Sequence, residues 1–543
     1  MTSQPSNSGP RTALTIDGVT LSLADVMSVA LNPGVAVSLS DDSAKNLQRT
    51  RDYIEANWLK DDAPLIYSFN TGVGNLKNTR IPSKEMSRFQ ANLIRSHAAG
   101  CGEPFSREIV RALMLLRANA FASDFSGPRL KVVERLLSML NFGIHPVVYS
   151  QGSVGASGDL APLAYLSAAL MGDPHAQVEF QNEMITADQA WRKVGQPPEF
   201  VYEAKDAVAL INGSTASLAV LCIALSEAKR LLAYADVSAA LSIEAIRGEL
   251  AAFDDRVHQA RRHPGQIECA KNLRRLLSGT QRCTEKTRQL TMSGPDQGKP
   301  NNQPARVQDV YSYRCTPQVH GPVYDAIRYI ENIIQIEMNS ATDNPLIFPE
   351  GDGYVAISGG NFHGQYLAQA SDLLSIVMAD LGGISERRLA RLIDPIMSLG
   401  MPANLAGRDP GINTGYSVVT CSMAALVMEN RTLSMPASVD SIPAKGNVED
   451  HVSNSTWASR KALRIIENTK QIIAVEMLLA NQAIGLTQSA LQNPQLGAGT
   501  QAAFDWMQKR IATSVEDDRY MHDDLVECKR WLESAELLET AFK

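Results

Sequence analysis

Long stretches of helical apolar periodicity are the feature that most restricts the fold of this chain. Between residues 322 and 341, four apolar side chains recur at spacings of four, three and four, so they share one helical face: Val323, Ile327, Ile330 and Ile334. Pro322 suits the start of this helix, and the Asp343-Asn344-Pro345 sequence suits its end. Similar periodicity, longer than an average globular helix, runs through residues 366–398, 417–434 and 457–486. Neighbouring helices of this length predict a central helical bundle.

Strand signals are few. Residues 15–26 alternate weakly, and two short apolar runs flank the sequence PEGDG, which predicts a hairpin over residues 346–357. Residues 284–305 lack periodicity and hold three prolines, so we expect a flexible surface loop there. We predict a mainly α fold, with a long central helical bundle and a smaller N-terminal α/β region. The expected order is a disordered tail (1–12), an N-terminal region (13–211), the central bundle (212–486) and a C-terminal helical region (487–543).

Composition excludes several classes of function. The 543 residues carry a net charge of −7, which argues against a nucleic-acid or anionic-membrane partner. The seven cysteines are odd in number and form no CxxC pair, as expected for free thiols in the cytoplasm. The N-terminus is polar, without the apolar core of a signal sequence, and we expect no membrane-spanning segment. The nine histidines form no HExxH pair, so no metal site is expected.

The most informative segment is QGSVGASGDLAPL, residues 151–163. It can be interpreted as a Gly-rich turn before a helix, with Asp159 at the helix start and Pro162 in the first turn. Alternatively, three glycines within seven residues allow unusual dihedral angles and a close approach between backbone segments. A phosphate-binding loop is a weaker option, because the segment matches neither GxxxxGK[ST] nor GxGxxG.

This segment resembles the signature of the aromatic amino acid ammonia-lyases and aminomutases. The resemblance extends from about residue 14 to about residue 486, and dispersed motifs in the same order support it: YSFNTGVG (67–74), NLIRSHAAG (92–100), ALINGS (209–214), VQDVYSYRCTPQV (307–319), SATDNPLIF (340–348), SGGNFHGQ (358–365) and SVDSIPAKGNVEDHVS (438–453). The resemblance implies a mainly α homotetramer whose active sites draw residues from three subunits.

The resemblance also implies a prosthetic group made from the chain itself, with no external cofactor. In this family an Ala-Ser-Gly tripeptide, here Ala156, Ser157 and Gly158, cyclises and loses water to form 4-methylidene-imidazol-5-one (MIO). The amide nitrogen of Gly158 attacks the carbonyl of Ala156, and the Ser157 hydroxyl leaves to create an electrophilic methylidene. Asp159 matches the acidic residue that assists cyclisation. Such an electrophile divides a difficult elimination of ammonia into easier steps.

Further residues match the family's catalytic and binding positions. Tyr67 matches the base that removes the β-proton, and its usual pKa near 10 implies that the site depresses it. Arg314 matches the cation for the substrate carboxylate, to which its planar guanidinium is suited. The other matched residues are a second catalytic tyrosine, polar residues around the MIO and the amino group, and an aromatic wall: Tyr311, Gln308, Asn212 and Phe362.

Two positions favour L-histidine, which would yield trans-urocanate, as the small-molecule substrate. The Ser96-His97 pair resembles histidine ammonia-lyases, although some tyrosine lyases and aminomutases share it. Glu449 also resembles histidine ammonia-lyases, whereas phenylalanine and tyrosine enzymes typically have Gln there. A carboxylate is a charge-assisted partner for imidazole and would stay unpaired beside a phenyl ring.

Four positions depart from the histidine ammonia-lyase pattern and keep other substrates open: Val448, Gln365, Val310 and Tyr313. Val448 replaces a glutamine and removes a polar contact. The alternatives are a tyrosine ammonia-lyase, an aromatic 2,3-aminomutase that gives a β-amino acid, and an inactive structural homolog. We would expect an inactive homolog if Tyr67, Ser157 or Tyr311 were replaced, but all three residues are present.

Overall fold

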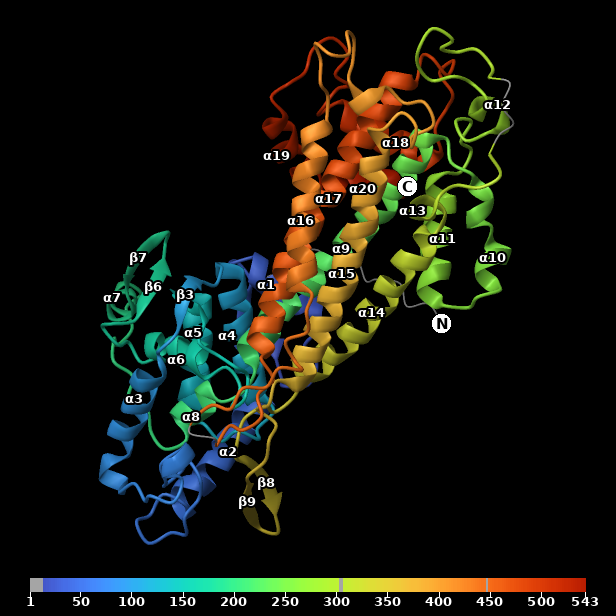
Figure 1. Ribbon diagram of the computed structural model, residues 1–543. Helices are drawn as coiled ribbons and strands as arrows, with labels where there is room; N and C mark the ends of the chain where they lie inside the picture. The colour runs from blue at the N-terminus through green and yellow to red at the C-terminus, as the bar shows by residue number, and fades with distance from the viewer. Residues whose placement is uncertain (1–12, 302–305, 446–447) are drawn as a thin grey trace. The chain divides into compact units, whose positions relative to one another are not determined.

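The chain is mainly helical, as its periodicity predicts (Figure 1). The computed structural model describes residues 13–301, 306–445 and 448–543, so the tail predicted for residues 1–12 lies outside the described residues. The chain divides into two units, each built from three segments. Unit 1 comprises residues 1–226, 330–372 and 436–463, and unit 2 comprises residues 227–329, 373–435 and 464–543. The domain boundaries predicted after residues 211 and 486 stay predictions.

Unit 1 combines helices with short strands. Its helices are α1 (Leu23–Leu31), α2 (Asp41–Asn57), α3 (Met86–His97), α4 (Arg107–Ala122), α5 (Leu130–Asn141), α6 (Leu160–Leu170), α7 (Ala187–Lys193) and α8 (Asp206–Ile211). Its strands are β1 (Ala13–Ile16), β2 (Ala36–Leu39), β3 (Cys101–Pro104), β4 (His145–Pro146), β5 (Tyr149–Gln151), β6 (Gln177–Phe180), β7 (Glu183–Thr186), β8 (Leu346–Glu350) and β9 (Gly353–Ile357).

The strands form small separate sheets. β1 pairs with β2 in parallel, with Ala13 opposite Ala36, and β3 pairs with β5 antiparallel. β4, β6 and β7 form a three-stranded antiparallel sheet. The predicted hairpin is confirmed, because β8 and β9 pair antiparallel from Leu346 opposite Ile357 to Glu350 opposite Gly353. The weak alternation over residues 15–26 is only partly strand, since β1 ends at Ile16 and α1 begins at Leu23.

Buried charges fix the centre of unit 1. Lys205 and Asp343 form an ion pair with Nζ 2.9 Å from Oδ2, and both side chains are fully buried. In α4, a buried guanidinium nitrogen of Arg117 donates to the Asn212 carbonyl (2.9 Å) and to the Thr215 hydroxyl (3.1 Å). Burial lowers the pKa of Arg117 to about 10, which still leaves it charged at neutral pH. Arg117 therefore anchors the backbone that carries Asn212.

Four of the five boundaries between the units lie within long helices: α9 (Thr215–Ile246), α14 (Thr316–Glu337), α15 (Gln365–Leu392) and α17 (Ser455–Thr487). The remaining helices belong to unit 2: α10 (Asp255–Gln259), α11 (Pro264–Leu276), α12 (Glu285–Arg288), α13 (Tyr311–Arg314), α16 (Ser417–Leu433), α18 (Ala498–Gln508), α19 (Met521–Trp531) and α20 (Glu536–Ala541). The segments of α15, α16 and α17 in unit 2 run alongside one another (Figure 1).

A buried ion pair ties these helices together. The Arg388 guanidinium of α15 binds the Glu476 carboxylate of α17 through two contacts, of 2.5 and 2.9 Å. The Ser242 hydroxyl from α9 and the Ser385 hydroxyl from α15 also donate to Glu476. The carboxylate is thus surrounded by donors, as a buried charge requires. These polar contacts link three helices of the predicted bundle.

Two expectations need correction. The helix predicted to begin at Pro322 begins at Thr316 and ends at Glu337, with Pro322 inside it. The loop predicted over residues 284–305 contains the short helix α12, and its residues 302–305 lie outside the described part of the chain.

Among the described residues, α15 is long and apolar enough to span a membrane by length and composition alone. However, most of its apolar stretch is buried inside the protein, which is typical of a core helix.

Candidate active site

The segment predicted to carry the chemistry folds back sharply before α6. Gly152, Gly155 and Gly158 all have positive φ, of 138°, 70° and 75°. α6 begins at Leu160, with Pro162 in its first turn as predicted. Asp159 stands at the N-cap position, but its side chain makes no capping hydrogen bond to α6. The segment is therefore more than a turn that caps a helix.

The tripeptide packs directly against the backbone at the end of α8. A Cβ added to Gly158 would lie 2.1 Å from the carbonyl carbon of Gly213, so only glycine fits. The Asp159 N–H donates to the Gly213 carbonyl (2.8 Å), and the Gly213 N–H donates to the Ser157 carbonyl (3.3 Å). The Asn212 side-chain amide donates to the same Ser157 carbonyl (2.7 Å). The Ser157 carbonyl is thus held from two sides.

Asp159 lies beneath the tripeptide as a fully buried carboxylate. It accepts the Ser217 N–H (2.7 Å) in the first turn of α9 and the hydroxyls of Ser153 (2.8 Å), Ser217 (3.0 Å) and Thr456 (2.6 Å). Burial raises the pKa of the Asp159 carboxyl, and the hydrogen bonds act in the opposite direction. A buried carboxyl in this position agrees with the acidic residue expected beside the tripeptide, and its role in cyclisation stays a prediction.

Cavities of about 190 and 920 Å³ lie in unit 1, and one of about 420 Å³ lies in unit 2. Ser157 lines the cavity of about 920 Å³. Eight of the predicted site residues line it: Tyr67, Ser96, His97, Ala156, Ser157, Asn212, Phe362 and Glu449. These residues come from separate motifs of the sequence, and the fold of unit 1 brings them together. Gly158 and Asp159 lie behind the cavity wall.

Glu449 contacts the tripeptide directly. The Ser157 hydroxyl donates to Glu449 Oε1 at 2.5 Å, although 292 residues separate the two in sequence. The Lys445 ammonium lies 3.2 Å from the same carboxylate oxygen. The Glu449 side chain is 10% exposed and that of Lys445 is 43% exposed. The carboxylate thus joins the Ser157 hydroxyl to a cation at the cavity wall.

His97 is oriented by the last turn of α3. Its Nδ1 lies 2.8 Å from the Leu93 carbonyl and 3.0 Å from the Ser96 hydroxyl. Because a carbonyl can only accept, Nδ1 carries the hydrogen and Nε2 is a hydrogen-bond acceptor. Burial lowers the pKa of His97, and the positive charge of Lys445 lowers it further. His97 is therefore a neutral acceptor at neutral pH.

Tyr67 and Phe362 complete the described wall around Ser157. The Tyr67 hydroxyl accepts the Gly74 N–H at 3.3 Å, and Gly74 begins a short 3-10 helix over Gly74–Leu76 that also lines the cavity. The Phe362 backbone carbonyl accepts the Ser214 hydroxyl (2.8 Å), which ties the GGNFH motif to the start of α9. Both aromatic residues are therefore fixed by contacts with glycine-rich or polar turns.

Three predicted site residues belong to unit 2: Gln308, Tyr311 and Arg314. Tyr311 is 70% exposed, and the Arg314 guanidinium lies over its ring, 4.7 Å from the centroid. The Nε atom of Arg314 is buried without a hydrogen-bond partner. Their assignment to the same active site as Ser157 stays a prediction.

The structure explains some of the four departures from the histidine ammonia-lyase pattern. Tyr313 is buried in unit 2 and its hydroxyl donates to the Arg388 carbonyl (3.3 Å), so it serves the core. The Gln365 side-chain amide donates to the Ser438 carbonyl (3.2 Å) and holds the start of α15 against the segment between α16 and α17. Val448 lines the cavity, where it replaces a polar side chain by an apolar one. Val310 is 41% exposed, and nothing in the structure explains it.

Sequence reasoning missed several residues of the cavity, including Phe89, Asn92, Asn344, His363 and Lys445. Asn92 opens the NLIRSHAAG motif, and Lys445 lies four residues before Glu449, so proximity to known motifs could have suggested both. Phe89 has no such signal, because an aromatic residue in a helix is usually part of a core. It faces the cavity because α3 also positions His97.

One group of potential metal ligands is present in the part of the chain that the structure describes. Asp236, Cys269 and His320 are buried together in unit 2. His320 Nδ1 lies 2.8 Å from Asp236 Oδ1, and the Cys269 thiol donates to the same oxygen (3.2 Å). Burial raises the pKa of the Cys269 thiol well above its usual range, which disfavours the thiolate that binds metals. We interpret the group as a buried hydrogen-bond network.

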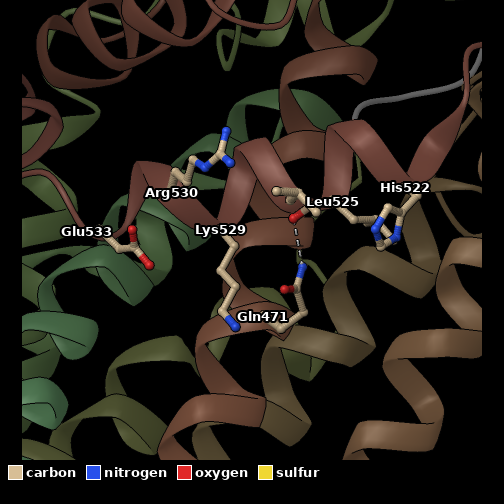
Figure 2. A pocket seen from close by; sticks show the side chains of 7 residues that line it. Gln471, His522, Leu525, Lys529, Arg530 and Glu533 are labelled. Atoms are coloured by element: carbon tan, nitrogen blue, oxygen red, sulfur yellow. Dashed lines mark hydrogen bonds between the residues drawn. The ribbon is translucent and has the colours of Figure 1, made fainter. Parts of the chain in front are cut away.

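The cavity of about 420 Å³ in unit 2 lies between α17 and α19 (Figure 2). The Gln471 amide donates to the Leu525 carbonyl across its floor (3.3 Å). Lys529 forms an ion pair with Glu467, and Arg530 contacts Glu527 at 3.3 Å. Because acidic neighbours pair with both cations, this cavity is a poor candidate for binding an anionic substrate.

Comparison with known proteins identifies the chain's relatives. The family described as aromatic amino acid lyase matches residues 21–509. The chain belongs to the aromatic amino acid lyase family. This lyase is 41% identical to a histidine ammonia-lyase of Alkaliphilus oremlandii, over 97% of this chain and 98% of the relative. It is 46% identical to a histidine ammonia-lyase of Geobacillus thermodenitrificans, over 86% and 87% of the two chains.

Solved structures place the lyase in the same fold. It superposes on the tyrosine aminomutase of Streptomyces globisporus with a TM-score of 0.87, at 32% identity, over 97% of this chain and 98% of the other. The predicted mainly α fold and the predicted family are thus confirmed, and the lyase is a carbon–nitrogen lyase by family. Relatives in the family include both ammonia-lyases and aminomutases.

Proposed function

We propose that this lyase eliminates ammonia from L-histidine to give trans-urocanate. The observation that carries the proposal is the single cavity in which the Ser157 hydroxyl, Tyr67, His97 and Glu449 meet. The identity of 41–46% to histidine ammonia-lyases over most of the chain supports the same substrate.

Ala156-Ser157-Gly158 is the proposed source of an MIO group, and the local geometry fits its formation. Gly158 has no side chain to hinder its nitrogen, and a Cβ there would collide with Gly213. Asn212 polarises the Ser157 carbonyl, and the buried Asp159 provides a carboxyl beside the tripeptide. When formed, the group supplies an electrophile that none of the ordinary side chains provides. No external cofactor is proposed.

The residues of the chain have distinct proposed roles. Tyr67 takes the β-proton of the substrate, and its hydroxyl is oriented by the Gly74 N–H. Arg314 binds the substrate carboxylate, to which its planar guanidinium is suited. His97 and Glu449 bind the imidazole ring, with Ser96 orienting His97. Tyr311, Gln308 and Phe362 complete the site as the second tyrosine, a polar lining residue and an aromatic wall.

The proposed assembly is a homotetramer with shared active sites, in which residues from unit 2 contribute to the active site of another subunit. Large apolar side chains are exposed on this single chain, among them Tyr366 (72%), Val418 (74%), Ile396 (87%) and Val439 (79%). Contacts between subunits would cover such side chains, and exposed Tyr311 would complete the cavity of another subunit. The seven cysteines are all free, as expected for a cytoplasmic protein.

The test incubates purified protein separately with L-histidine and L-tyrosine and follows the ultraviolet absorbance of urocanate and coumarate. Chromatography tests for β-amino acids, since the structural similarity to a tyrosine aminomutase makes an aromatic 2,3-aminomutase the second candidate. Ser157→Ala is the blank, and intact mass reports the loss of two water molecules on MIO formation. Urocanate that is absent from the blank supports the proposal. Coumarate alone contradicts the substrate assignment, and a β-amino acid alone contradicts the assigned reaction. No turnover of either amino acid, despite the mass loss, contradicts the proposed function.

A further inference from the structure

Lys445 occupies the cavity without a role in the function proposed above. It lies in the segment between α16 and α17, where the backbones of Ala444 and Glu449 pair: the Ala444 N–H donates to the Glu449 carbonyl (2.8 Å), and the Glu449 N–H donates back (3.3 Å). This pairing holds the Lys445 and Glu449 side chains next to each other. The Lys445 ammonium is consequently fixed 3.2 Å from Glu449 Oε1.

The ammonium retains hydrogen-bonding capacity in the cavity. It has three N–H donors, and the contact with Glu449 uses one of them. The side chain is 43% exposed and lines the cavity, so a bound ring can reach the other donors. Lys445 is also within electrostatic reach of His97, whose pKa its charge lowers.

Lys445 and His97 present opposite hydrogen-bonding groups. His97 Nδ1 is committed to the Leu93 carbonyl, so its Nε2 accepts, whereas Lys445 can only donate. A neutral imidazole has one N–H donor and one nitrogen acceptor, and a phenol oxygen both donates and accepts. A phenyl ring offers neither a donor nor an acceptor, and it would displace water from both protein groups without replacing their hydrogen bonds.

We propose that Lys445 is a specificity-determining residue that selects substrates whose aromatic ring carries a hydrogen-bond acceptor. Its ammonium donates to the ring acceptor and holds Glu449 in place, while His97 Nε2 accepts from the ring donor. The inference rests on the proposed ammonia-lyase function and adds a substrate class to it: aromatic L-amino acids with both a donor and an acceptor on the ring. Histidine and tyrosine belong to this class, and phenylalanine does not.

The matched variants are Lys445→Met, which removes the charge and keeps a long side chain, and Lys445→Arg, which keeps the charge. Lys45→Met, at a side chain 77% exposed on α2, is the control for loss of a lysine elsewhere. The kcat/KM of each protein is measured with L-histidine, L-tyrosine and L-phenylalanine. We expect Lys445→Met to lower kcat/KM for rings with an acceptor roughly ten- to a hundredfold, the usual effect of losing a hydrogen bond to a charged group. The value for phenylalanine should not fall.

A second measurement is independent of MIO formation and of turnover. In the Ser157→Ala background, calorimetry compares the binding of urocanate and cinnamate with and without Lys445→Met. We expect urocanate binding to weaken, cinnamate binding to persist, and Lys445→Arg to restore part of the urocanate affinity. An equal loss for all substrates and both ligands would overturn the role of Lys445. Absence of product from wild-type protein, with urocanate binding that still depends on Lys445, would instead contradict only the proposed function.

Discussion

Replacing Asp159 tests whether the buried carboxylate holds the tripeptide in place. The Asp159 side chain accepts one backbone N–H and three hydroxyl hydrogen bonds, from Ser153, Ser217 and Thr456. The hydroxyls have other partners: Ser217 also contacts the Ser455 and Thr456 hydroxyls, and Ser153 also reaches the Gly158 carbonyl. The Ser217 N–H has no such alternative, because a backbone donor in a helix cannot rotate.

The size of the effect follows from this difference. Asp159→Ala leaves the buried Ser217 N–H without an acceptor, at a cost of about 1–3 kcal/mol. Part of this cost is offset, because burial also disfavours the charged carboxylate, as its raised pKa indicates. Asp159→Asn keeps an oxygen for the Ser217 N–H, and hydroxyls can turn to accept from its amide. We therefore expect Asp159→Ala to destabilise by about 2 kcal/mol and Asp159→Asn by less than about 1 kcal/mol.

The assay is urea unfolding followed by circular dichroism. Both variants are made in the Ser157→Ala background, so that differences in cyclisation do not contribute to stability. Asp62→Ala, at an exposed carboxylate, is the matched control. The reasoning is refuted if Asp159→Ala unfolds at the same urea concentration as its parent, or if Asp159→Asn is destabilised as much as Asp159→Ala.

Two further predictions concern the tripeptide and acid stability. Gly158→Ala places a methyl group 2.1 Å from the Gly213 carbonyl carbon at a φ of 75°, so we expect at least about 1–2 kcal/mol of destabilisation and no mass loss of two water molecules. Intact mass and urea unfolding check this, and a fully cyclised variant would contradict it. For His145, burial and the nearby Arg111 charge lower the pKa to about 4, whereas an unfolded histidine titrates near 6.5. As the pH falls, His145 therefore binds a proton in the unfolded state before it does so in the folded state. The free energy of unfolding is unaffected by this group above about pH 6.5 and decreases towards pH 4, by at most about 3 kcal/mol. Urea unfolding at several pH values should show a smaller decrease in His145→Gln, and equal slopes would contradict the assignment.

Elements with strong local periodicity could be predicted from the sequence. The ranges 366–398, 417–434 and 457–486 correspond to α15, α16 and α17, whose bounds are Gln365–Leu392, Ser417–Leu433 and Ser455–Thr487. A long amphipathic repeat has one stable solution, a helix with its apolar side buried. The β8–β9 hairpin was predictable for the same reason, because its turn is local.

The start of α14 could not be predicted, because tertiary contacts decide it. Local rules place Pro322 in the first turn of a helix, yet the helix begins six residues earlier, at Thr316. His320, two residues before Pro322, contacts the buried Asp236 of α9. This contact stabilises the turn before the proline, at a position where the proline removes a backbone hydrogen bond.

The sequence by itself determined the family and the tripeptide from which the MIO is proposed to form. Ala156-Ser157-Gly158 is a contiguous motif, and the proposed cyclisation involves bonds between neighbouring residues only. The environment of that tripeptide depends instead on contacts between distant segments. The Ser157 hydroxyl contacts Glu449 across 292 residues, and Lys445 lines the same cavity, although its place in the 438–453 motif predicted no role for it. Such contacts were decided only by the tertiary structure, because hydrogen bonds and ion pairs act over a few ångströms in space, whatever the distance along the chain.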